Sequence, residues 1–212
     1  PMPSLPWDLI RSLPEHVPRL SREGRAAVVV LGYCDGWRAV RDIEEAVLRL
    51  AGGLQTSGLE PGQRIFIRMG NSFDYAIVFF AATAIGAIPI PASPMLTTRE
   101  VASLLQHSGA SVIAWDGGLE LPPVDRIRLL TPEDLARLRK APPAGYADSV
   151  ADDPAYLVYA SGTSGLPKGA LHAHRAVWGR RPMYDGWYGI TADDVVLHAG
   201  AFNWTYTLGT GL

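Results

Sequence analysis

One stretch of this 212-residue chain, between Asp74 and Arg99, carries no charged side chain and limits the possible folds more than any other feature. Its length is close to the ~20 residues with which a helix spans a bilayer. Gly86 and three later prolines interrupt it, so a helix that starts near Asp74 ends near Gly86 after about 12 residues, a rise of ~18 Å. Such a helix is too short to cross a membrane, and we expect no membrane insertion. The stretch predicts a buried helix followed by a buried strand.

Short apolar runs and amphipathic segments alternate around this stretch. The apolar runs are residues 64–69, 87–90 and 110–115, and the segments with helical spacing are residues 42–57, 71–84 and 97–107. A strand, a helix and a second strand within about 30 residues form the crossover unit of a parallel sheet. We therefore predict an α/β fold of layered, mostly parallel sheets with flanking helices.

Capping residues and turn signals set the ends of the expected elements. Asp42 is a candidate N-cap for the first helix, and Asn71 or Ser72 for the second. Residues 26–41 hold two apolar runs around a turn-like cluster, which predicts a hairpin. In the second half of the chain we expect strands at residues 155–160 and 195–198 and a helix at residues 173–187.

Two segments without periodicity divide the chain. Residues 117–123 and 141–154 are rich in Gly, Pro and Asp, a composition typical of loops and joints. We expect residues 1–150 to form an N-terminal α/β subdomain with parallel strands and a linker. Residues 151–212 are then the start of a second subdomain.

Charge and cysteine content exclude several classes of function. The 19 Lys and Arg residues nearly balance the 21 Asp and Glu residues, with a formal net charge of −2, so nucleic acid is not an expected partner. Cys34 is the single cysteine, which excludes an internal disulfide. His172 and His174 lack acidic or cysteine neighbours, so we expect no metal site. Because no secretory signal is visible and the lone thiol suits a reducing compartment, we expect a cytoplasmic protein.

The segment with the clearest chemistry follows the strand expected at residues 155–160. It combines glycines, hydroxyl side chains and one lysine within nine positions, 161–169. A loop with so little side-chain bulk lets several backbone N–H groups converge on one anion, and hydroxyls and an ammonium add further donors. Polyphosphate is the expected ligand. The candidate nucleotide- and phosphate-binding residues are Ser161, Gly162, Thr163, Ser164, Gly165, Lys168 and Gly169.

Three common loop motifs do not match this segment. A Walker loop requires Gly before its lysine and Ser or Thr after it, whereas Pro167 and Gly169 flank Lys168. The glycine spacing also differs from that of a dinucleotide-binding loop, and Leu166 stands where a nucleophile elbow needs Gly.

Residues 159–169 are instead similar to the phosphate-binding motif of the adenylate-forming superfamily. This superfamily includes acyl-CoA synthetases, nonribosomal adenylation domains and firefly-type luciferases. Its motif reads Tyr-x-Ser-Gly-Thr-Thr-Gly-x-Pro-Lys-Gly, and the chain departs from it at Ser164, which keeps the hydroxyl. The resemblance extends over most of the chain and implies the incomplete N-terminal part of a large adenylating domain.

The resemblance implies an AMP-forming acid:CoA ligase that uses ATP, Mg²⁺ and coenzyme A. The carboxylate of a small acid attacks the α-phosphorus of ATP, pyrophosphate leaves, and a thiol then displaces AMP from the acyl adenylate. The loop N–H groups, Thr163, Ser164 and Lys168 would hold the departing phosphates. The family's later motifs, with its catalytic lysine, would lie beyond Leu212. We therefore expect no catalytic residue in this chain, little activity without the missing C-terminal portion, and that portion as its partner.

The segment 202–209 is similar to the acyl-pocket segment of benzoate and aminobenzoate CoA ligases. Phe202 and Trp204 are the candidate pocket residues and favour an aryl or short acyl acid, although aromatic residues occupy cores as readily as pockets. Three alternatives remain open: a carrier-protein adenylation domain, a luciferase-like enzyme, and a nonenzymatic nucleotide-binding module.

Overall fold

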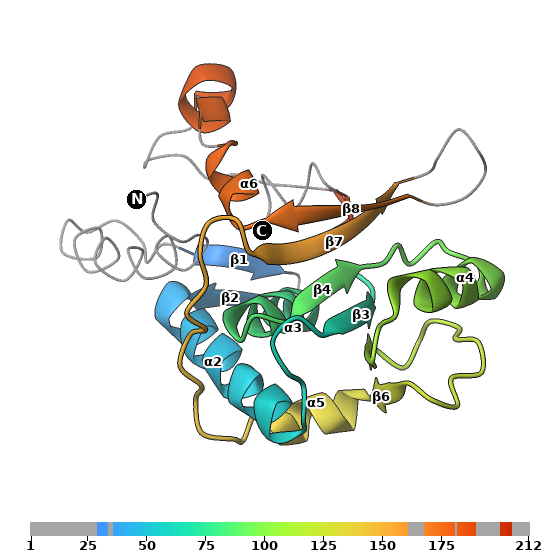
Figure 1. Ribbon diagram of the computed structural model, residues 1–212. Coiled ribbons are helices and arrows are strands. Elements are labelled where there is room, and N and C mark those ends of the chain that lie inside the picture. Colours follow the sequence, from blue (N-terminus) through green and yellow to red (C-terminus); the bar gives the residue numbers. More distant parts are fainter. Residues whose placement is uncertain (1–28, 34–35, 161–167, 181, 190–199, 205–212) are drawn as a thin grey trace.

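The computed structural model describes residues 29–33, 36–160, 168–180, 182–189 and 200–204 (Figure 1). The first element is an antiparallel pair of strands, β1 (Val29–Tyr33) and β2 (Gly36–Ala39), which confirms the expected hairpin. β2 leads directly into helix α2 (Val40–Thr56). Asp42 therefore lies inside the first helical turn, and its prediction as N-cap is wrong. A carboxylate at this place still complements the helix dipole.

A parallel sheet forms the centre of the part of the chain between residues 64 and 130. Its strands are β3 (Arg64–Arg68), β4 (Ile88–Pro91), β5 (Val112–Trp115) and β6 (Arg128–Leu130), in the order β4-β3-β5-β6. All of its neighbouring strands run parallel, which confirms the predicted mostly parallel α/β fold. Helix α3 (Phe73–Ala84) connects β3 to β4, and helix α4 (Thr98–Ser108) connects β4 to β5.

The two connecting helices lie on opposite faces of this sheet. The chain moves from β3 to one side and then returns past β3 to β5, and right-handed crossovers in opposite directions place their helices on opposite faces. Side chains of β3 alternate accordingly. Ile65 and Ile67 belong to the core cluster under α2 and α3, whereas Phe66 belongs to the cluster under α4.

The uncharged stretch folds as the sequence predicts. Ser72 caps α3 by accepting a hydrogen bond from the Tyr75 amide at 3.1 Å. The helix ends just before Gly86, which adopts a φ of +74°, a conformation that favours glycine. Every residue of β4 is buried. Among the described residues no helix is long and apolar enough to cross a membrane.

Strand β4 forms one edge of the parallel sheet because of its alternating prolines. The amides of Ile88 and Ala92 donate toward β3, to Gln63 O at 2.8 Å and to Ile67 O at 3.2 Å. Since N–H groups alternate in direction along a strand, Pro89 and Pro91 occupy the positions whose amides would face away from β3. Proline has no N–H, so this outer edge offers no donors to another strand.

A separate antiparallel pair lies beside β4 (Figure 1). It consists of β7 (Pro154–Ala160), which confirms the expected strand, and β8 (Lys168–Ala173). The prediction of one helix at residues 173–187 is wrong. β8 extends to Ala173, and among the described residues a short α6 (Arg175–Trp178) and a π-helical turn, η1 (Tyr184–Tyr188), follow. Gly179 and Pro182 disfavour a continuous helix at this point. The strand expected at residues 195–198 lies outside the described residues.

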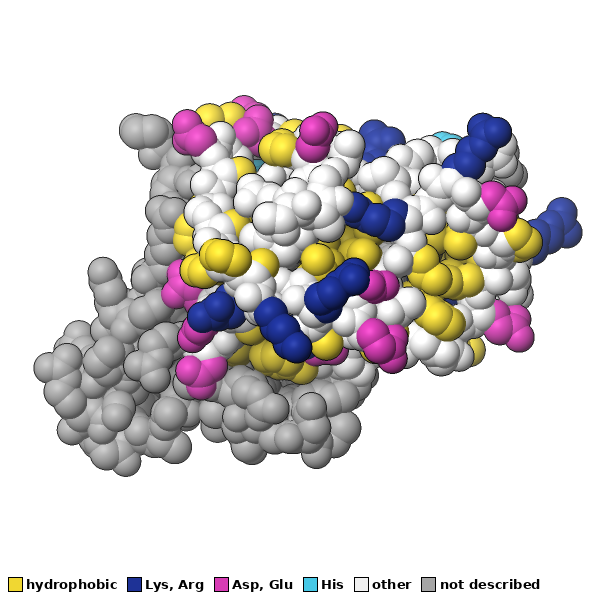
Figure 2. Space-filling view, turned by 90° about the horizontal axis from the view of Figure 1, so that it is seen from below, with side chains coloured by type: hydrophobic (Ala, Val, Ile, Leu, Met, Phe, Trp, Pro, Cys, Tyr) yellow, Lys and Arg dark blue, Asp and Glu magenta, His cyan; other side chains and the backbone are white. Residues whose placement is uncertain are grey.

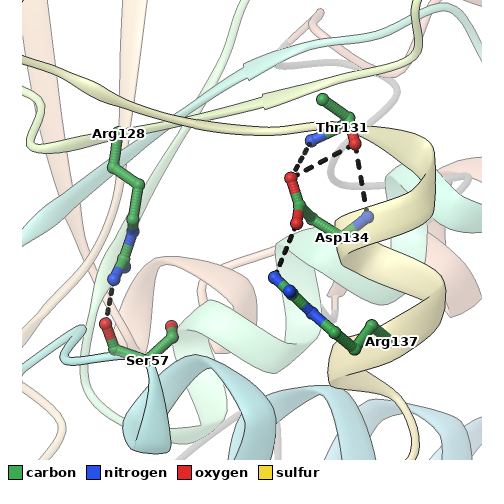
Figure 3. A network of polar contacts seen from close by, with 5 residues as sticks. All are labelled: Ser57, Arg128, Thr131, Asp134 and Arg137. Atoms are coloured by element: carbon green, nitrogen blue, oxygen red, sulfur yellow. Dashed lines mark hydrogen bonds and ion pairs between the residues drawn. The ribbon is translucent and has the colours of Figure 1, made fainter.

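The sequence predicted neither β8 nor β6 and the helix α5 (Pro132–Leu138) that follows β6 (Figure 3). Thr131 and Asp134 form a capping box, in which the Asp134 amide donates to Thr131 Oγ1 at 3.3 Å. Arg137 donates to the same carboxylate at 2.6 Å. Arg128 of β6 donates to the Ser57 carbonyl just after α2. The first two contacts stabilise the start of α5, and the Arg128 contact connects the strand before α5 to the end of α2, which α5 also contacts.

The surface over α2 and α5 has no separate basic patch. Figure 2 shows the Lys and Arg side chains of this face interspersed with acidic and apolar ones. Arg137 pairs with Asp134, and Arg139 pairs with Asp74 at 2.8 Å. Charges of both signs on one face agree with the small net charge of the chain.

Two adjacent glycines let α2 approach the segment after α5 closely. A Cβ at Gly53 would lie 2.7 Å from Leu138 Cβ and would also contact the Leu138 carbonyl. A Cβ at Gly52 would contact the Pro142 carbonyl. Backbone atoms cannot rotate away as a flexible side chain does, so the close packing requires glycine at both positions.

Replacement of Gly53 by Ala tests this packing. Alanine usually stabilises a helix by ~1 kcal/mol relative to glycine, but here we expect a loss of about 1–3 kcal/mol through overpacking. Urea unfolding measures the change. The matched control is Gly145→Ala, because a Cβ there meets nothing within 4 Å. A Gly53→Ala protein as stable as Gly145→Ala would contradict the interpretation.

Candidate functional site: the β7–β8 hairpin and the 200–204 segment

The described part of the candidate phosphate-binding motif lies at the end of the β7–β8 hairpin where the two strands are connected. Lys168 begins β8 opposite Ala160, and Gly169 lies opposite Tyr159. Lys168 and Gly169 are exposed. Residues 161–167, with the other candidate ligands Ser161, Gly162, Thr163, Ser164 and Gly165, lie outside the described residues.

Gly169 allows the Tyr159 ring to lie against β8. A Cβ at position 169 would be 3.3 Å from Tyr159 Cε1 and 3.1 Å from Leu157 Cδ1. Both distances are shorter than ordinary van der Waals contact, so a larger residue would displace the ring. On the other side, the Tyr159 hydroxyl is hydrogen-bonded to His107 Nδ1 of α4 at 2.8 Å. Tyr159 thus connects α4 to both strands of the hairpin.

The parallel sheet has its own common ligand position, where protein groups bond to one another. Open α/β sheets often bind ligands where strand order reverses, here between the carboxyl ends of β3 and β5. At this point Asp116 Oδ2 accepts a hydrogen bond from the Gly70 amide at 2.7 Å. The buried Arg68 donates to the carbonyls of Ser93 and Leu96 at 2.6 and 2.9 Å. Burial lowers the pKa of Arg68, and Asp116 and Glu120 oppose this change. The candidate loop instead leaves a strand of the antiparallel pair.

The two histidines after the motif lie in different environments. His172 stacks on Tyr156 with ring centroids 4.6 Å apart. Burial and, to a smaller extent, Arg180 lower the pKa of His172. His174 is buried at the start of α6. In the part of the chain that the structure describes, no three His, Cys, Asp or Glu side chains come together as a metal site.

The candidate acyl-pocket segment is attached to the start of α3 by Asn71. The Asn71 Nδ2 group donates to Gly200 O at 3.0 Å, and the Phe202 amide donates to Asn71 Oδ1 at 2.9 Å. The side-chain amide thus contacts the segment as the backbone of a neighbouring strand would. Ser72 serves as N-cap, so Asn71 has no capping role.

Phe202 and Trp204 differ in exposure. Phe202 is buried, 7% exposed, and its ring lies 5.5 Å from that of Tyr75, centroid to centroid. Trp204 is 61% exposed. Burial also raises the pKa of the Tyr75 phenol, so this ring remains neutral. The two residues of the predicted pocket therefore have different surroundings.

Helix α3 supports both candidate segments through one row of aromatic rings. Tyr75 and Phe79 are four residues apart and so share a face of α3. Tyr75 contacts Phe202, while the Phe79 ring lies 5.8 Å from that of Tyr156, which stacks on His172. The 200–204 segment and the β7–β8 hairpin therefore rest on the same helix.

The sequence matches the AMP-binding enzyme family over residues 19–212. The chain belongs to this family. A 4-hydroxybenzoate–CoA/benzoate–CoA ligase of Rhodopseudomonas palustris is 27% identical over 217 residues, covering 93% of this chain and 40% of that protein. The 4-coumarate–CoA ligase 1 of Oryza sativa subsp. japonica is 31% identical over 222 residues, covering 91% of this chain and 39% of that protein.

A solved structure shows the same fold. The benzoate CoA ligase from Burkholderia xenovorans matches with a TM-score of 0.79 at 27% identity, covering 94% of this chain and 42% of that one. The chain thus spans less than half the length of each of these relatives. The structure described here is the N-terminal part of the adenylate-forming fold.

In this AMP-binding chain, sequence reasoning missed two residues that position the candidate segments. The sequence predicts Asn71 as a candidate helix cap and places His107 at the end of an ordinary amphipathic helix. Their partners, Gly200, Phe202 and Tyr159, are 129, 131 and 52 residues away. No local signal marks such contacts.

Amide hydrogen exchange tests the role of Asn71. In Asn71→Ala the Phe202 amide loses its acceptor, so we expect this amide to exchange about fivefold faster, as the loss of one hydrogen bond predicts. Ser72→Ala is the matched control, since it removes the N-cap acceptor of α3 but leaves the Asn71 contacts. Unchanged protection of Phe202 in Asn71→Ala would show that the segment is held by other contacts.

The depressed pKa of His172 predicts how stability depends on pH. Because the folded state disfavours the imidazolium, the unfolded state binds more protons below the ordinary histidine value of 6.5. His172 therefore contributes stability that is complete above about pH 6.5 and is lost as the pH falls through its folded-state pKa. We expect His172→Phe, which keeps the ring on Tyr156, to weaken the loss of melting temperature between pH 7 and pH 5. Parallel curves for the two proteins would contradict this.

Proposed function

We propose that this chain is the N-terminal portion of an AMP-forming acid:CoA ligase, and that residues 151–212 begin its second subdomain. The observation that carries the proposal is the β7–β8 hairpin, whose connected end presents Lys168 and Gly169 of the adenylate-forming motif on a fold matched by a benzoate CoA ligase. Relatives named as CoA ligases for aromatic acids support the reaction class.

The proposed reaction has two steps with one leaving group each. A carboxylate oxygen attacks the α-phosphorus of ATP, the bond to the β-phosphate oxygen breaks, and pyrophosphate departs. The thiol sulfur of coenzyme A then attacks the acyl carbon, the thiol proton is lost, and AMP leaves with the former carboxylate oxygen. The first step requires positive groups near the departing phosphates.

Lys168 is the described residue suited to that requirement. Its ammonium is exposed at the start of β8, where it can reach a phosphate oxygen. In the proposed site the hydroxyls of Ser161, Thr163 and Ser164 and the backbone N–H groups of Gly162, Gly165 and Gly169 supply further donors. Mg²⁺ would enter with ATP, since it binds mainly phosphate oxygens and water and neutralises phosphate charge.

The acid is proposed to be small and aromatic. Phe202 is buried against Tyr75, so we assign it to the wall behind the pocket, and we assign the exposed Trp204 to contact with the acid. A planar side chain beside an aryl acid gains from ring stacking. ATP and coenzyme A as substrates agree with a cytoplasmic location.

Pyrophosphate exchange with the full-length protein tests this function. A panel of benzoates, aminobenzoates and fatty acids identifies the acid, and coenzyme A offered beside a phosphopantetheinylated carrier protein identifies the thiol. Exchange followed by acyl-CoA formation supports the proposal. Transfer to the carrier protein alone would favour an adenylation domain, and nucleotide binding without exchange would favour a nonenzymatic module.

Lys168→Ala should lower the rate of pyrophosphate exchange on the order of 10–100-fold, the usual effect of removing a charged hydrogen-bond partner. The melting temperature should change little because the side chain is exposed. Lys168→Arg keeps the charge and should retain more activity. Lys140→Ala removes an exposed lysine elsewhere and serves as control. Full exchange in Lys168→Ala would exclude this role.

A further inference from the structure

The β7–β8 hairpin, whose second strand begins with Lys168, is attached to helix α4 beside the parallel sheet by a specific polar contact. His107 Nδ1 lies 2.8 Å from the Tyr159 hydroxyl, and the two rings meet edge to face with centroids 5.6 Å apart. His107 is exposed and Tyr159 is half-buried. Apolar packing alone does not require a histidine there, because a leucine could cover the ring equally well.

The end of α4 that carries His107 is held in place by its own contacts. α4 ends at Gly109, which adopts the left-handed conformation, and Arg64 of β3 donates to the Ser108 carbonyl at 2.5 Å. The last turn of α4 is thus bonded to the beginning of the central strand. A side chain on this turn can orient its partner because its own backbone is fixed.

Tyr159, the other residue of this contact, is one residue pair away from Lys168 in the β7–β8 ladder. Tyr159 lies opposite Gly169, and the next pair is Ala160 with Lys168. The Tyr159 ring packs directly against Gly169, since a Cβ at position 169 would lie 3.3 Å from Tyr159 Cε1. A shift of the ring therefore moves the backbone from which Lys168 extends.

The Tyr159 hydroxyl retains its proton at neutral pH. Burial raises its pKa, and the positive charge of Arg64 and a hydrogen bond with Ser108 oppose this only in part. A neutral hydroxyl can donate to an unprotonated Nδ1, and it can also accept from a protonated one.

We propose that His107 is a positioning residue that acts through Tyr159 to hold Lys168 where it meets the phosphates of ATP. The role rests on the proposed function for the identity of the nucleotide. It differs from general stabilisation because it should affect ATP and leave the acid unaffected.

The experiment measures ATP binding and pyrophosphate exchange on the full-length protein. The variants are His107→Leu, Tyr159→Phe, the double variant and His107→Asn, whose amide can occupy the place of Nδ1. Gln106→Ala, an exposed neighbour on α4, is the matched control. A fluorescent ATP analogue gives the dissociation constant without turnover.

We expect His107→Leu and Tyr159→Phe each to weaken ATP binding and raise the KM for ATP about fivefold, the effect of one hydrogen bond. The KM for the acid should stay unchanged. The double variant should resemble the single ones because both remove the same contact. His107→Asn should recover most of the affinity, and Gln106→Ala should match the unmodified protein.

Two results would overturn the positioning role: unchanged ATP affinity in His107→Leu, or equal losses for ATP and acid together with a lower melting temperature, which indicate a merely structural contact. A protein that exchanges no pyrophosphate but binds ATP more weakly in these variants would refute the ligase and keep the positioning role. Absence of ATP binding in the unmodified protein would refute both.

Discussion

Burial of α3 is the constraint on which the rest of the structure depends. Nearly all of its residues, from Tyr75 to Ala84, are buried, and a helix that is apolar on every side must be covered on every side. The parallel sheet and α2 cover part of it. The remaining aromatic face, Tyr75 and Phe79, is covered by the 200–204 segment and by β7. The same requirement that buries the helix therefore gathers the two candidate binding segments on it.

The prolines of β4 explain why the candidate phosphate-binding motif lies outside the central sheet. An outer edge with free amides at positions 89 and 91 could pair with β7 and extend the sheet. Without those donors β7 packs beside β4 but pairs with β8. The motif thus becomes the connection of a hairpin, which can take its own angle to the sheet. The Gly70 amide and Asp116 meanwhile bond to each other at the carboxyl ends of β3 and β5, where such sheets often bind ligands.

Local signals predicted most of the fold, and contacts distant in sequence account for most of what was missed. Ser72 and Gly86 mark the ends of α3 by their own chemistry, so the sequence sufficed there. The single helix predicted at residues 173–187 is wrong because Gly179 and Pro182 disfavour a continuous helix there. β6 has three residues, too few for a periodic pattern. The motif predicts the chemistry of Lys168 from the sequence. Only the fold shows that His107 contacts Tyr159, which lies one residue pair from Lys168.

Hydrogen bonds orient the β7–β8 hairpin and the 200–204 segment, which apolar packing alone would attach without a fixed angle. The aromatic rings on α3 pack against the hairpin and the 200–204 segment. Packing of this kind is not directional and permits small rotations. Each segment also makes a polar contact with a residue beside the parallel sheet. Tyr159 of the hairpin contacts His107 of α4, and Gly200 and Phe202 contact Asn71 at the start of α3. Such bonds weaken steeply when their geometry is lost. The proposed ligase would have to align a carboxylate with a phosphorus atom, and contacts of this kind are suited to fix the angle at which the two candidate binding segments face each other.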